Sequence, residues 1–289
     1  MPSPREVPPA TPHLFAPTAQ RPVRCKRLSH AADTRVVPHQ HPWAQLAYSS
    51  SGVTRLTAAQ GTFLAPPSRA VWVPPNVEHA VTMLDDCEYF TVYLAQRPGA
   101  CGPAAVLEAP PAHLGGASPA ARDWSVCQVL EVTELLRALI LNLDTRGDDL
   151  GPGPTATEQA RQDRLMHSLL DELSRARPVA LGLPMPRDKR LRALCEAIVD
   201  DPARHSTLAA WAADAAASER TLARLFRSEL DTSFAQWRQQ ALIARAMTLA
   251  AAGQPMNRIA SQLGYASPSA FSAMVRRELG TTPSALFKA

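Results

Sequence analysis

The sequence predicts a two-domain α+β protein, in which an N-terminal β-barrel with attached helices is followed by an all-α C-terminal domain. Three observations predict this fold. Short strand-like runs separated by turn residues fill residues 23–110, amphipathic helical patterns follow in 111–178, and a repeated helical pattern fills 188–289. A chain of 289 residues with 46% hydrophobic residues can build two separate cores.

The cysteines, the N-terminus and the hydropathy favour a cytoplasmic protein. Residues 1–22 are Pro-rich and predict a disordered leader rather than a signal peptide. No run of about 18 apolar residues indicates a membrane-spanning helix, so we expect no membrane partner. The cysteines are odd in number, scattered and without a C-x-x-C pair, which argues against a disulfide framework and a zinc cluster. They are Cys25, Cys87, Cys101, Cys127 and Cys195.

The runs in 23–110 have the polarity of short strands. Gly, Pro, Asn and Asp separate them at the spacing of a small barrel. The clearest run is "EYFTVYLA", residues 88–95, where alternate side chains must lie on opposite faces. One face is expected to carry Phe90, Val92 and Leu94, and the other Tyr89, Thr91 and Tyr93.

Two helices are expected after the barrel, in a connector or dimerisation region. "VCQVLEVTELLRALILNL", residues 126–143, has an apolar stripe at Val129, Val132, Leu135, Leu136, Leu139 and Leu143. Thr157 can cap a second helix, in which Leu165, Leu169 and Leu173 recur every four residues. The apolar faces can pack on their own domain, form a dimer interface, or do both. Residues 179–187 are interpreted as an extended linker.

The C-terminal domain contains an internal repeat. "TLARLFRSELDT", residues 221–232, aligns with "AFSAMVRRELGT", residues 270–281, and their apolar positions coincide. Each copy is a short helix, a tight turn and a second helix, with Ser218 and Ser267 placed as N-caps of the second helices. A helix-prone stretch separates the copies. Two such units at a fixed offset can reach successive major grooves, about 34 Å apart on one DNA face.

Charge agrees with a nucleic-acid partner. Residues 187–289 hold 14 Lys and Arg against 9 Asp and Glu, whereas the whole chain has a net charge of +4. The basic excess therefore belongs to the C-terminal domain.

The repeat, its connecting helix and "GYASPSAFSAMVRRELGTTPSAL" closely resemble the AraC/XylS family of bacterial transcription regulators over residues 190–287. The resemblance implies that the second helix of each unit reads DNA. Asp231 and Val275 depart from the family pattern, which has glycine and phenylalanine there. The implied DNA-binding residues are Ser218, Glu219, Arg220, Ala223, Arg224, Arg227, Ser267, Pro268, Ser269, Ser272, Ala273, Arg276 and Arg277.

The arginines are expected to play two roles. Arg220 and Arg224 lie one turn apart and suit bidentate contacts to guanine edges. The others, Arg227, Arg276 and Arg277, suit phosphate contacts, which add affinity without sequence information. The second reader has few long polar side chains, so we expect it to discriminate less.

In "HQHPWAQL", His39 and His41 are two residues apart and can share one face of a strand. The barrel resembles a cupin, whose first motif is Gly-x5-His-x-His-x3/4-Glu-x6-Gly. His39, His41 and Gly52 match it, but Gln45 replaces the Glu and Asp33 replaces the first Gly. An amide carries no charge, so Gln45 should weaken metal binding.

The second cupin motif, Pro-x-Gly-x-x-His, is matched by Pro74 and His79, with Asn76 in place of Gly. Three readings follow: an organic effector pocket, a divalent metal site (Zn, Fe, Ni or Mn) made by the three histidines, or histidines satisfied by backbone hydrogen bonds. We favour the pocket, formed by His39, His41, Trp43, Gln45, Trp72, His79, Tyr89 and Tyr93.

The sequence thus predicts a cytoplasmic, nucleoid-associated transcription regulator, activator or repressor, in which a small-molecule effector controls binding to double-stranded DNA. We expect a homodimer, a contact with RNA polymerase if the protein activates, and no catalytic residue or certain cofactor. One alternative is a metal-sensing regulator that uses His39, His41 and His79. The other is a cupin metalloenzyme with an incidental helical tail.

Overall fold

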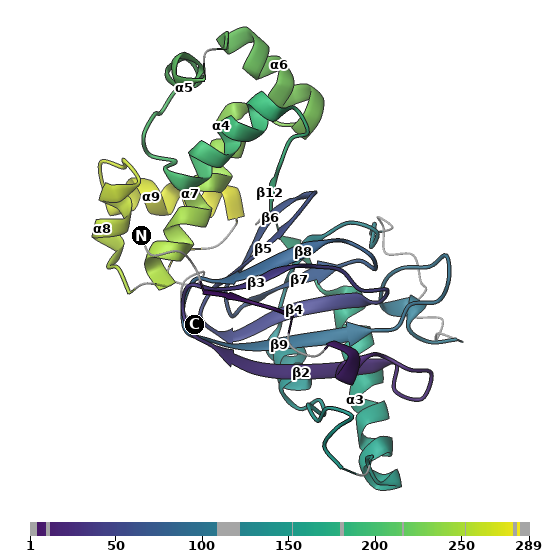
Figure 1. The fold of residues 1–289 in the computed structure, drawn as a ribbon. Coiled ribbons are helices and arrows are strands. Elements are labelled where there is room, and N and C mark those ends of the chain that lie inside the picture. The colour runs from purple at the N-terminus through teal and green to yellow at the C-terminus, as the bar shows by residue number, and fades with distance from the viewer. Residues whose placement is uncertain are drawn as a thin grey trace. The chain divides into compact units, whose positions relative to one another are not determined.

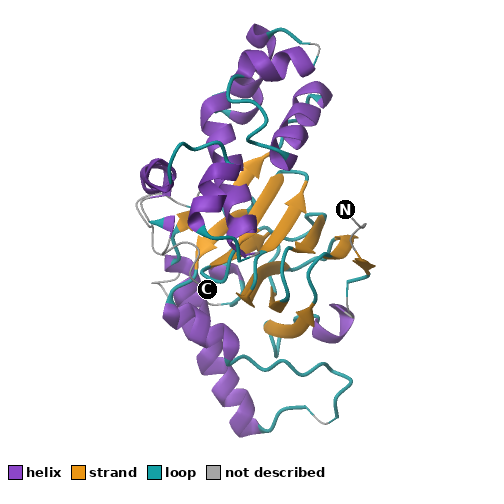
Figure 2. Cartoon of the chain, turned by 90° about the vertical axis from the view of Figure 1, so that its left-hand side faces the viewer, coloured by secondary structure: helices purple, strands orange, loops and turns teal. Residues whose placement is uncertain are grey.

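The computed structural model describes residues 5–9, 12–108, 122–151, 153–179, 182–215, 217–251, 253–279 and 282–283. Parts of the leader, of the expected 111–178 region and of the C-terminus lie outside these ranges. The chain divides into two compact units, one formed by Met1–Ala58 with Ala65–Val179 and the other by Ala59–Leu64 with Ala180–Lys288. Strands dominate the first unit and helices the second (Figures 1 and 2).

The first unit contains two β-sheets. The predicted two-domain α+β layout is confirmed, but the barrel is not closed, because the described strands form two separate hydrogen-bonded sheets. The strands of one sheet that lie in this unit have the order β1 (Arg5–Val7), β3 (Thr34–His39), β8 (His79–Met83) and β5 (Thr54–Ala58). The other has the order β11 (Pro178–Val179), β10 (Gln128–Glu131), β7 (Arg69–Val73), β4 (Ala44–Ser51), β9 (Cys87–Leu94) and β2 (Val23–His30).

The described part of the leader is folded, so the expected disorder of residues 1–22 is wrong there. The strand β1 runs parallel to β3, and the Arg5 amide donates to the Asp33 carbonyl at 2.9 Å. The 3₁₀-helix η1 (Pro12–Phe15) buries Phe15, whose ring lies 5.7 Å from the Arg24 guanidinium carbon. Pairing with a sheet edge compensates a segment whose composition alone predicts disorder.

The helices α2 (Glu134–Leu141) and α3 (Ala156–Arg175) pack on one face of the second sheet. The core they share with the strands includes Leu46, Tyr48, Trp72, Phe90, Val92, Leu94, Leu136, Leu139, Leu169 and Leu173. The predicted alternation of residues 88–95 is confirmed, since the Phe90 face joins this core. Packing on their own domain is therefore confirmed for the helices.

Both helices begin elsewhere than expected. Residues 128–131 form β10, and α2 starts only after Thr133, whose hydroxyl accepts from the Leu136 amide at 3.1 Å. As a result Leu135 does not join the buried stripe and is 55% exposed. The N-cap of α3 is Thr155 rather than Thr157, because Thr155 forms a capping box with Glu158.

The second unit begins with a strand pair. The segment expected as a linker contains β12 (Gly182–Pro184), which pairs with β6 (Gly61–Ala65). Gly61 is required there, because its φ is +151° and a Cβ would lie 2.5 Å from the Leu183 carbonyl oxygen. The buried Trp237 donates from Nε1 to the Pro184 carbonyl at 2.9 Å, which ties the helices to this strand.

The remaining elements of the unit are helices: α4 (Lys189–Asp200), α5 (Leu208–Asp214), α6 (Glu219–Leu230), α7 (Phe234–Ala251), α8 (Met256–Gln262) and α9 (Pro268–Leu279). The pairs α5–α6 and α8–α9 are the two predicted helix-turn-helix units, and α7 connects them (Figure 1). Asp231 ends α6 in the left-handed conformation with φ 47°, where the family pattern has glycine.

Candidate functional site

The helix α6 has a buried apolar face and an exposed basic face. The Ser218 hydroxyl accepts a hydrogen bond from the Thr221 amide at 3.1 Å and so caps its N-terminus. The buried face consists of Leu222, Leu225 and Phe226. The side chains expected at DNA lie opposite: Glu219, Arg220, Arg224 and Arg227 are exposed, and Ala223 is half-buried.

The helix α9 repeats this plan with less charge. Its cap is Ser267, whose hydroxyl accepts from the Ala270 amide at 3.2 Å. The buried side includes Phe271, Met274 and Val275, so valine fills the phenylalanine position without exposure. The expected DNA-facing residues Pro268, Ser269, Ala273, Arg276 and Arg277 are exposed, and Ser272 is half-buried.

The arginines of α6 are available for a partner. Across the described ranges, no hydrogen bond or ion pair engages Arg220, Arg224 or Arg227. Arg277 differs, because its Nε donates to Glu278 at 3.0 Å. Three unengaged guanidinium groups on one helical face form a cationic surface that suits phosphates and guanine edges.

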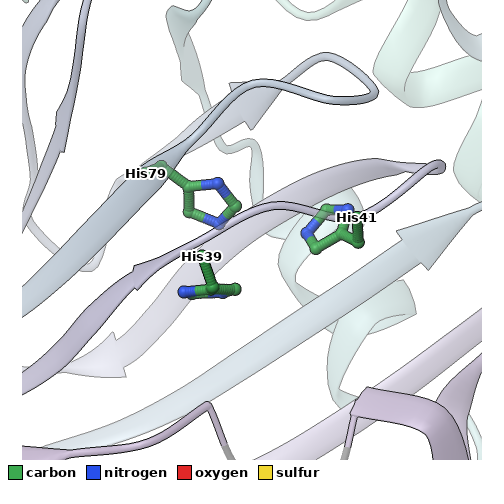
Figure 3. Close-up of side chains that lie close together, drawn as sticks. All are labelled: His39, His41 and His79. Atoms are coloured by element: carbon green, nitrogen blue, oxygen red, sulfur yellow. The ribbon is translucent and has the colours of Figure 1, made fainter.

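A second cluster lies in the first unit, where three imidazoles gather around one point (Figure 3). His39 ends β3 and pairs directly with His79 at the start of β8. His41 follows in the loop to β4, outside the strand on which we expected it. The ring centroids are 4.4 Å apart for His39–His79, 5.2 Å for His41–His79 and 6.1 Å for His39–His41.

Local backbone geometry brings these histidines together. The pairing of β3 with β8 shifts register between Val36 and His39, and such an irregularity re-aims the side chains that follow. The turn before His79 contains Asn76 with φ 60°, and the Asn76 amide donates to the His41 carbonyl at 2.8 Å. Asparagine tolerates this conformation better than most residues, which explains why it can replace the motif's glycine.

Burial keeps the three imidazoles neutral. It lowers the pKa of His39 and His41, and it lowers the pKa of His79 to about 3. Each ring also contacts a backbone carbonyl through Nδ1, with His39 bound to Val37 at 2.9 Å, His41 to Trp43 at 2.8 Å and His79 to Val77 at 2.9 Å. A carbonyl only accepts, so Nδ1 carries the hydrogen and Nε2 the lone pair.

A narrow cavity of about 30 Å³ adjoins the cluster. Its polar lining is Lys26, His30, His39, Gln45, Tyr89, Thr91 and Tyr93. Burial lowers the pKa of Lys26 to about 8, and its ammonium lies 5.8 Å from the centre of the Tyr93 ring. The buried Tyr89 hydroxyl has no hydrogen-bond partner among the described atoms.

Two expected aromatic residues of the pocket meet His41. The rings of Trp43 and His41 are stacked with centroids 5.3 Å apart, and Tyr93 lies edge-on to His41 at 5.3 Å.

The assignment of Trp72 to the pocket is wrong. Trp72 faces the helices, donating from Nε1 to the Trp124 carbonyl at 2.9 Å within the core shared with α2 and α3. In the register of β4 and β7, Trp72 pairs with Leu46, whereas Val73 pairs with Gln45 of the pocket. Directly paired residues lie on the same face of a sheet, so Trp72 cannot share the pocket's face.

The sequence reasoning missed Lys26 and His30 on β2, and Pro8 and Pro9 of the leader, which also line the cavity. The sequence pattern of β2 could have indicated the two β2 residues. In "VRCKRLSH", Lys26, Leu28 and His30 recur every second residue and must therefore share a face.

Comparisons with known proteins agree with this architecture. Residues 21–170 match the AraC-like ligand binding domain, and residues 211–289 match a helix-turn-helix domain. The chain is 31% identical to the HTH-type transcriptional regulator NimR of Escherichia coli (strain K12) over 247 residues, which is 85% of this chain and 80% of NimR. It therefore belongs to the AraC family of helix-turn-helix transcription regulators, with a ligand-binding N-terminal domain and a DNA-binding C-terminal domain.

More distant similarities were also found. The HTH-type transcriptional regulator RipA of Corynebacterium glutamicum is 32% identical over 101 residues, which is 35% of this chain and 30% of RipA. A DNA-binding transcriptional dual regulator of Escherichia coli K-12 is 27% identical, with a TM-score of 0.32, over 35% of this chain and 91% of its own. Fatty-acid-bound ToxT of Vibrio cholerae is 14% identical, with a TM-score of 0.35, over 92% of this chain and 94% of its own.

Within the part of the chain that the structure describes, no helix combines the length and apolar character needed to cross a membrane.

Proposed function

We propose that this regulator reads DNA mainly through α6 and that a ligand held near His39 and the cavity controls this reading. The observation that carries the proposal is the face of α6, where Arg220, Arg224 and Arg227 are exposed and unengaged by other described residues. Arginines one turn apart can contact neighbouring bases, while Arg227 near the end of the helix suits a phosphate.

The helix α9 supports a second, weaker contact. Its exposed face offers Ser269, Ala273 and Arg276, which provide one charge and little hydrogen-bonding capacity toward bases. Two readers of one chain would occupy successive major grooves, with centres about 10–10.5 base pairs apart. Sequence specificity would therefore come from the half-site that α6 contacts, whereas both half-sites would contribute to DNA affinity.

The ligand site would act by linkage. A ligand that binds one arrangement of the chain more tightly shifts the population toward that arrangement, and DNA affinity changes with it. The cavity lining of Lys26, His30 and Tyr93 is polar and cationic, which favours a ligand with acceptor atoms. No chemical step is needed for this role, and we propose that the protein acts without catalysis.

The assembly and location belong to the same proposal. Among the described residues, the large exposed hydrophobic side chains are Val126, which precedes β10, Leu135 on α2, and Leu150 in the segment between α2 and α3. These side chains support a homodimer through this region. We place the protein in the cytoplasm on the nucleoid, where it would contact RNA polymerase if it activates transcription.

Footprinting with the full chain tests the proposal. The protein is incubated with the DNA that flanks its own gene, and methylation interference then maps contacted guanines. We expect contacts in two major-groove segments on one face, about one helical turn apart, and their loss under α6 in Arg220→Ala and Arg224→Ala. Retardation of every DNA fragment to the same extent would contradict sequence-specific reading.

A further inference from the structure

We propose that Lys26 is a covalent ligand site, at which the side-chain amine condenses with a small aldehyde to form an imine inside the cavity that adjoins the histidine cluster. Control of DNA binding by this imine rests on the proposed function, whereas formation of the imine does not. The observation that carries the inference is a buried amine and a buried phenol in one narrow cavity. Lys26 is 7% exposed, Tyr89 is 5% exposed, and both line the cavity.

Lysine is rare in this chain, which makes the buried lysine notable chemically. The sequence contains 27 Arg and three Lys, and the lysines are Lys26, Lys189 and Lys288. A guanidinium group stays protonated in proteins, whereas an amine loses its proton readily when burial penalises the charge. The cation that lines the cavity is therefore of the type that can become a nucleophile.

Burial makes the neutral amine available. It lowers the pKa of Lys26 from 10.5 to about 8. At pH 7 about one tenth of the amine is then neutral, compared with about one part in 3,000 for an ordinary lysine. Burial also lowers the pKa of His30 and His39 and raises the pKa of the two tyrosines in the lining, Tyr89 and Tyr93. These four side chains are therefore neutral near pH 7, and Asp and Glu are absent from the described residues that line the cavity.

Strand register places the phenol beside the amine. In the pairing of β2 with β9, Lys26 lies directly opposite Thr91. Tyr89 and Tyr93 are each two residues from Thr91, so all three project from the same face of β9. Diagonal neighbours across two strands lie about 7–8 Å apart, which is within reach of a long side chain. The Lys26 ammonium lies over one of them, 5.8 Å from the centre of the Tyr93 ring.

The Tyr89 hydroxyl is suited to hold the carbonyl oxygen of the aldehyde. The hydroxyl is buried and has no hydrogen-bond partner among the described atoms. Such an unsatisfied buried group costs free energy. A carbonyl oxygen in the cavity would accept the hydroxyl hydrogen, and this hydrogen bond would draw electron density from the carbonyl carbon. One aldehyde molecule would thus satisfy the phenol and present an electrophile to the amine of Lys26.

The size of the cavity limits the size of the aldehyde. About 30 Å³ holds about two water molecules, far less than the roughly 300–1,000 Å³ typical of organic-ligand sites. Acetaldehyde leaves only a short two-carbon group on the nitrogen after condensation, whereas an aromatic aldehyde would leave a whole ring. The lining also includes the exposed Pro8 and the half-buried Pro9 and His39, which leave a small molecule a route from solvent.

The condensation needs no further reagent. The neutral amine adds to the carbonyl carbon, and the two amine hydrogens then leave with the carbonyl oxygen as water. A C=N bond replaces the C=O bond, so nothing is oxidised or reduced. The step is reversible, so occupancy follows the aldehyde concentration. An imine that forms in one arrangement of the chain more readily than in another shifts the population toward that arrangement.

Reductive trapping tests imine formation. Full-length protein is incubated at pH 7 with acetaldehyde and cyanoborohydride, which converts each imine into an N-ethyl amine, and is then cleaved after glutamate. The three lysines fall in separate fragments, residues 7–78, 173–196 and 279–289, which mass spectrometry distinguishes. We expect Lys26 to be ethylated at least about tenfold faster than the exposed Lys189, because an exposed lysine is almost wholly protonated at pH 7.

Two controls examine the cavity and the phenol. Benzaldehyde should label Lys189 but not Lys26, because its ring exceeds the cavity. Tyr89→Phe keeps the ring and loses the hydroxyl, and it should slow ethylation of Lys26 at least about tenfold without affecting Lys189. In protein whose circular dichroism is native, ethylation of Lys26 no faster than that of Lys189 would overturn the covalent site. Labelling of Lys26 by both aldehydes would exclude the cavity, and an unchanged rate in Tyr89→Phe would exclude the phenol.

The regulatory half is tested separately, by retardation of operator DNA with and without acetaldehyde and without reductant. We expect operator affinity to change at least about fivefold in the wild type and in Lys189→Arg, but not in Lys26→Met, which lacks the amine. A trapped imine without any change in operator affinity would overturn the regulatory half. Absence of sequence-specific DNA binding with and without acetaldehyde would instead refute the proposed function, while the trapping experiment still decides the covalent site.

Discussion

The packing of α2 on the second sheet predicts a large loss of stability on truncation of one leucine and almost none on truncation of its neighbour. Leu136 is fully buried in the core shared with the sheet, whereas Leu135 is 55% exposed. Replacing Leu136 by Ala removes about three buried carbon groups at about 0.8 kcal/mol each and leaves a cavity, for a total of about 3 kcal/mol. Leu135→Ala should change the free energy of unfolding by less than about 0.5 kcal/mol.

Urea denaturation of both variants checks this prediction. Because the chain has two units, unfolding is followed by the fluorescence of a variant that keeps the tryptophans of the first unit and replaces Trp211 and Trp237 by Phe. We expect a lower midpoint for Leu136→Ala and a wild-type midpoint for Leu135→Ala at equal protein concentration. Equal midpoints in the two variants would refute the packing of α2 described above.

Three further predictions concern charge, capping and backbone conformation. Burial lowers the pKa of Lys26 from 10.5 to about 8, so the free energy of unfolding rises as pH rises from about 8 to 10.5, and this gain is lost as pH falls through 8. Denaturation curves measured across this pH range should show the rise in wild type and lose it in Lys26→Met. The control variant Lys189→Met, which changes an exposed lysine, should keep it. Ser218→Ala removes the cap of α6 and should cost about 1 kcal/mol in thermal unfolding, unlike Ser228→Ala on the same helix, and equal costs would exclude the cap. Asp231 has φ 47°, a conformation that glycine adopts freely and alanine does not. In thermal unfolding, Asp231→Ala should therefore lower the free energy of unfolding by about 1 kcal/mol and Asp231→Gly by less than about 0.5 kcal/mol. An equal loss in the two variants would show that the backbone conformation is not the cause.

The parts of the fold that could be predicted are those that depend on residues close together in the sequence. Period-two polarity identified the two faces of residues 88–95, and the internal repeat identified both helix-turn-helix units. The departures from the motif glycines carried information as well. Asp33, Asn76 and Asp231 are the described residues other than glycine with positive φ, and all three stand where the family patterns have glycine. Asp and Asn are the substitutions that this conformation tolerates best.

The parts that could not be predicted depend on strand register and long-range pairing. Whether Trp72 faced the pocket or the helices depended on the pairing of β7 with β4, which no local pattern fixes. The leader was misread for the same reason, because β1 is stabilised by an edge of β3 far along the chain. Residues 128–131 formed a strand within an apolar stretch of helical period, since partners on both sides outweighed local preference.

The histidine cluster could be predicted only in part. The spacing of His39 and His41 indicated a shared direction, but the contribution of His79 depends on its pairing with His39 across the sheet. The carbonyl contacts that orient all three rings depend on loop geometry that the sequence does not display.

The most direct test of the account is the specificity of the Arg224→Ala variant. The ratio of dissociation constants for operator and unrelated DNA is measured at several salt concentrations for wild type, Arg224→Ala and Arg227→Ala. We expect Arg224→Ala to lower this ratio by the equivalent of about 1–3 kcal/mol, and Arg227→Ala to keep the ratio while reducing the salt slope by about one. An unchanged ratio in Arg224→Ala would contradict the assignment of α6 as the helix that reads DNA.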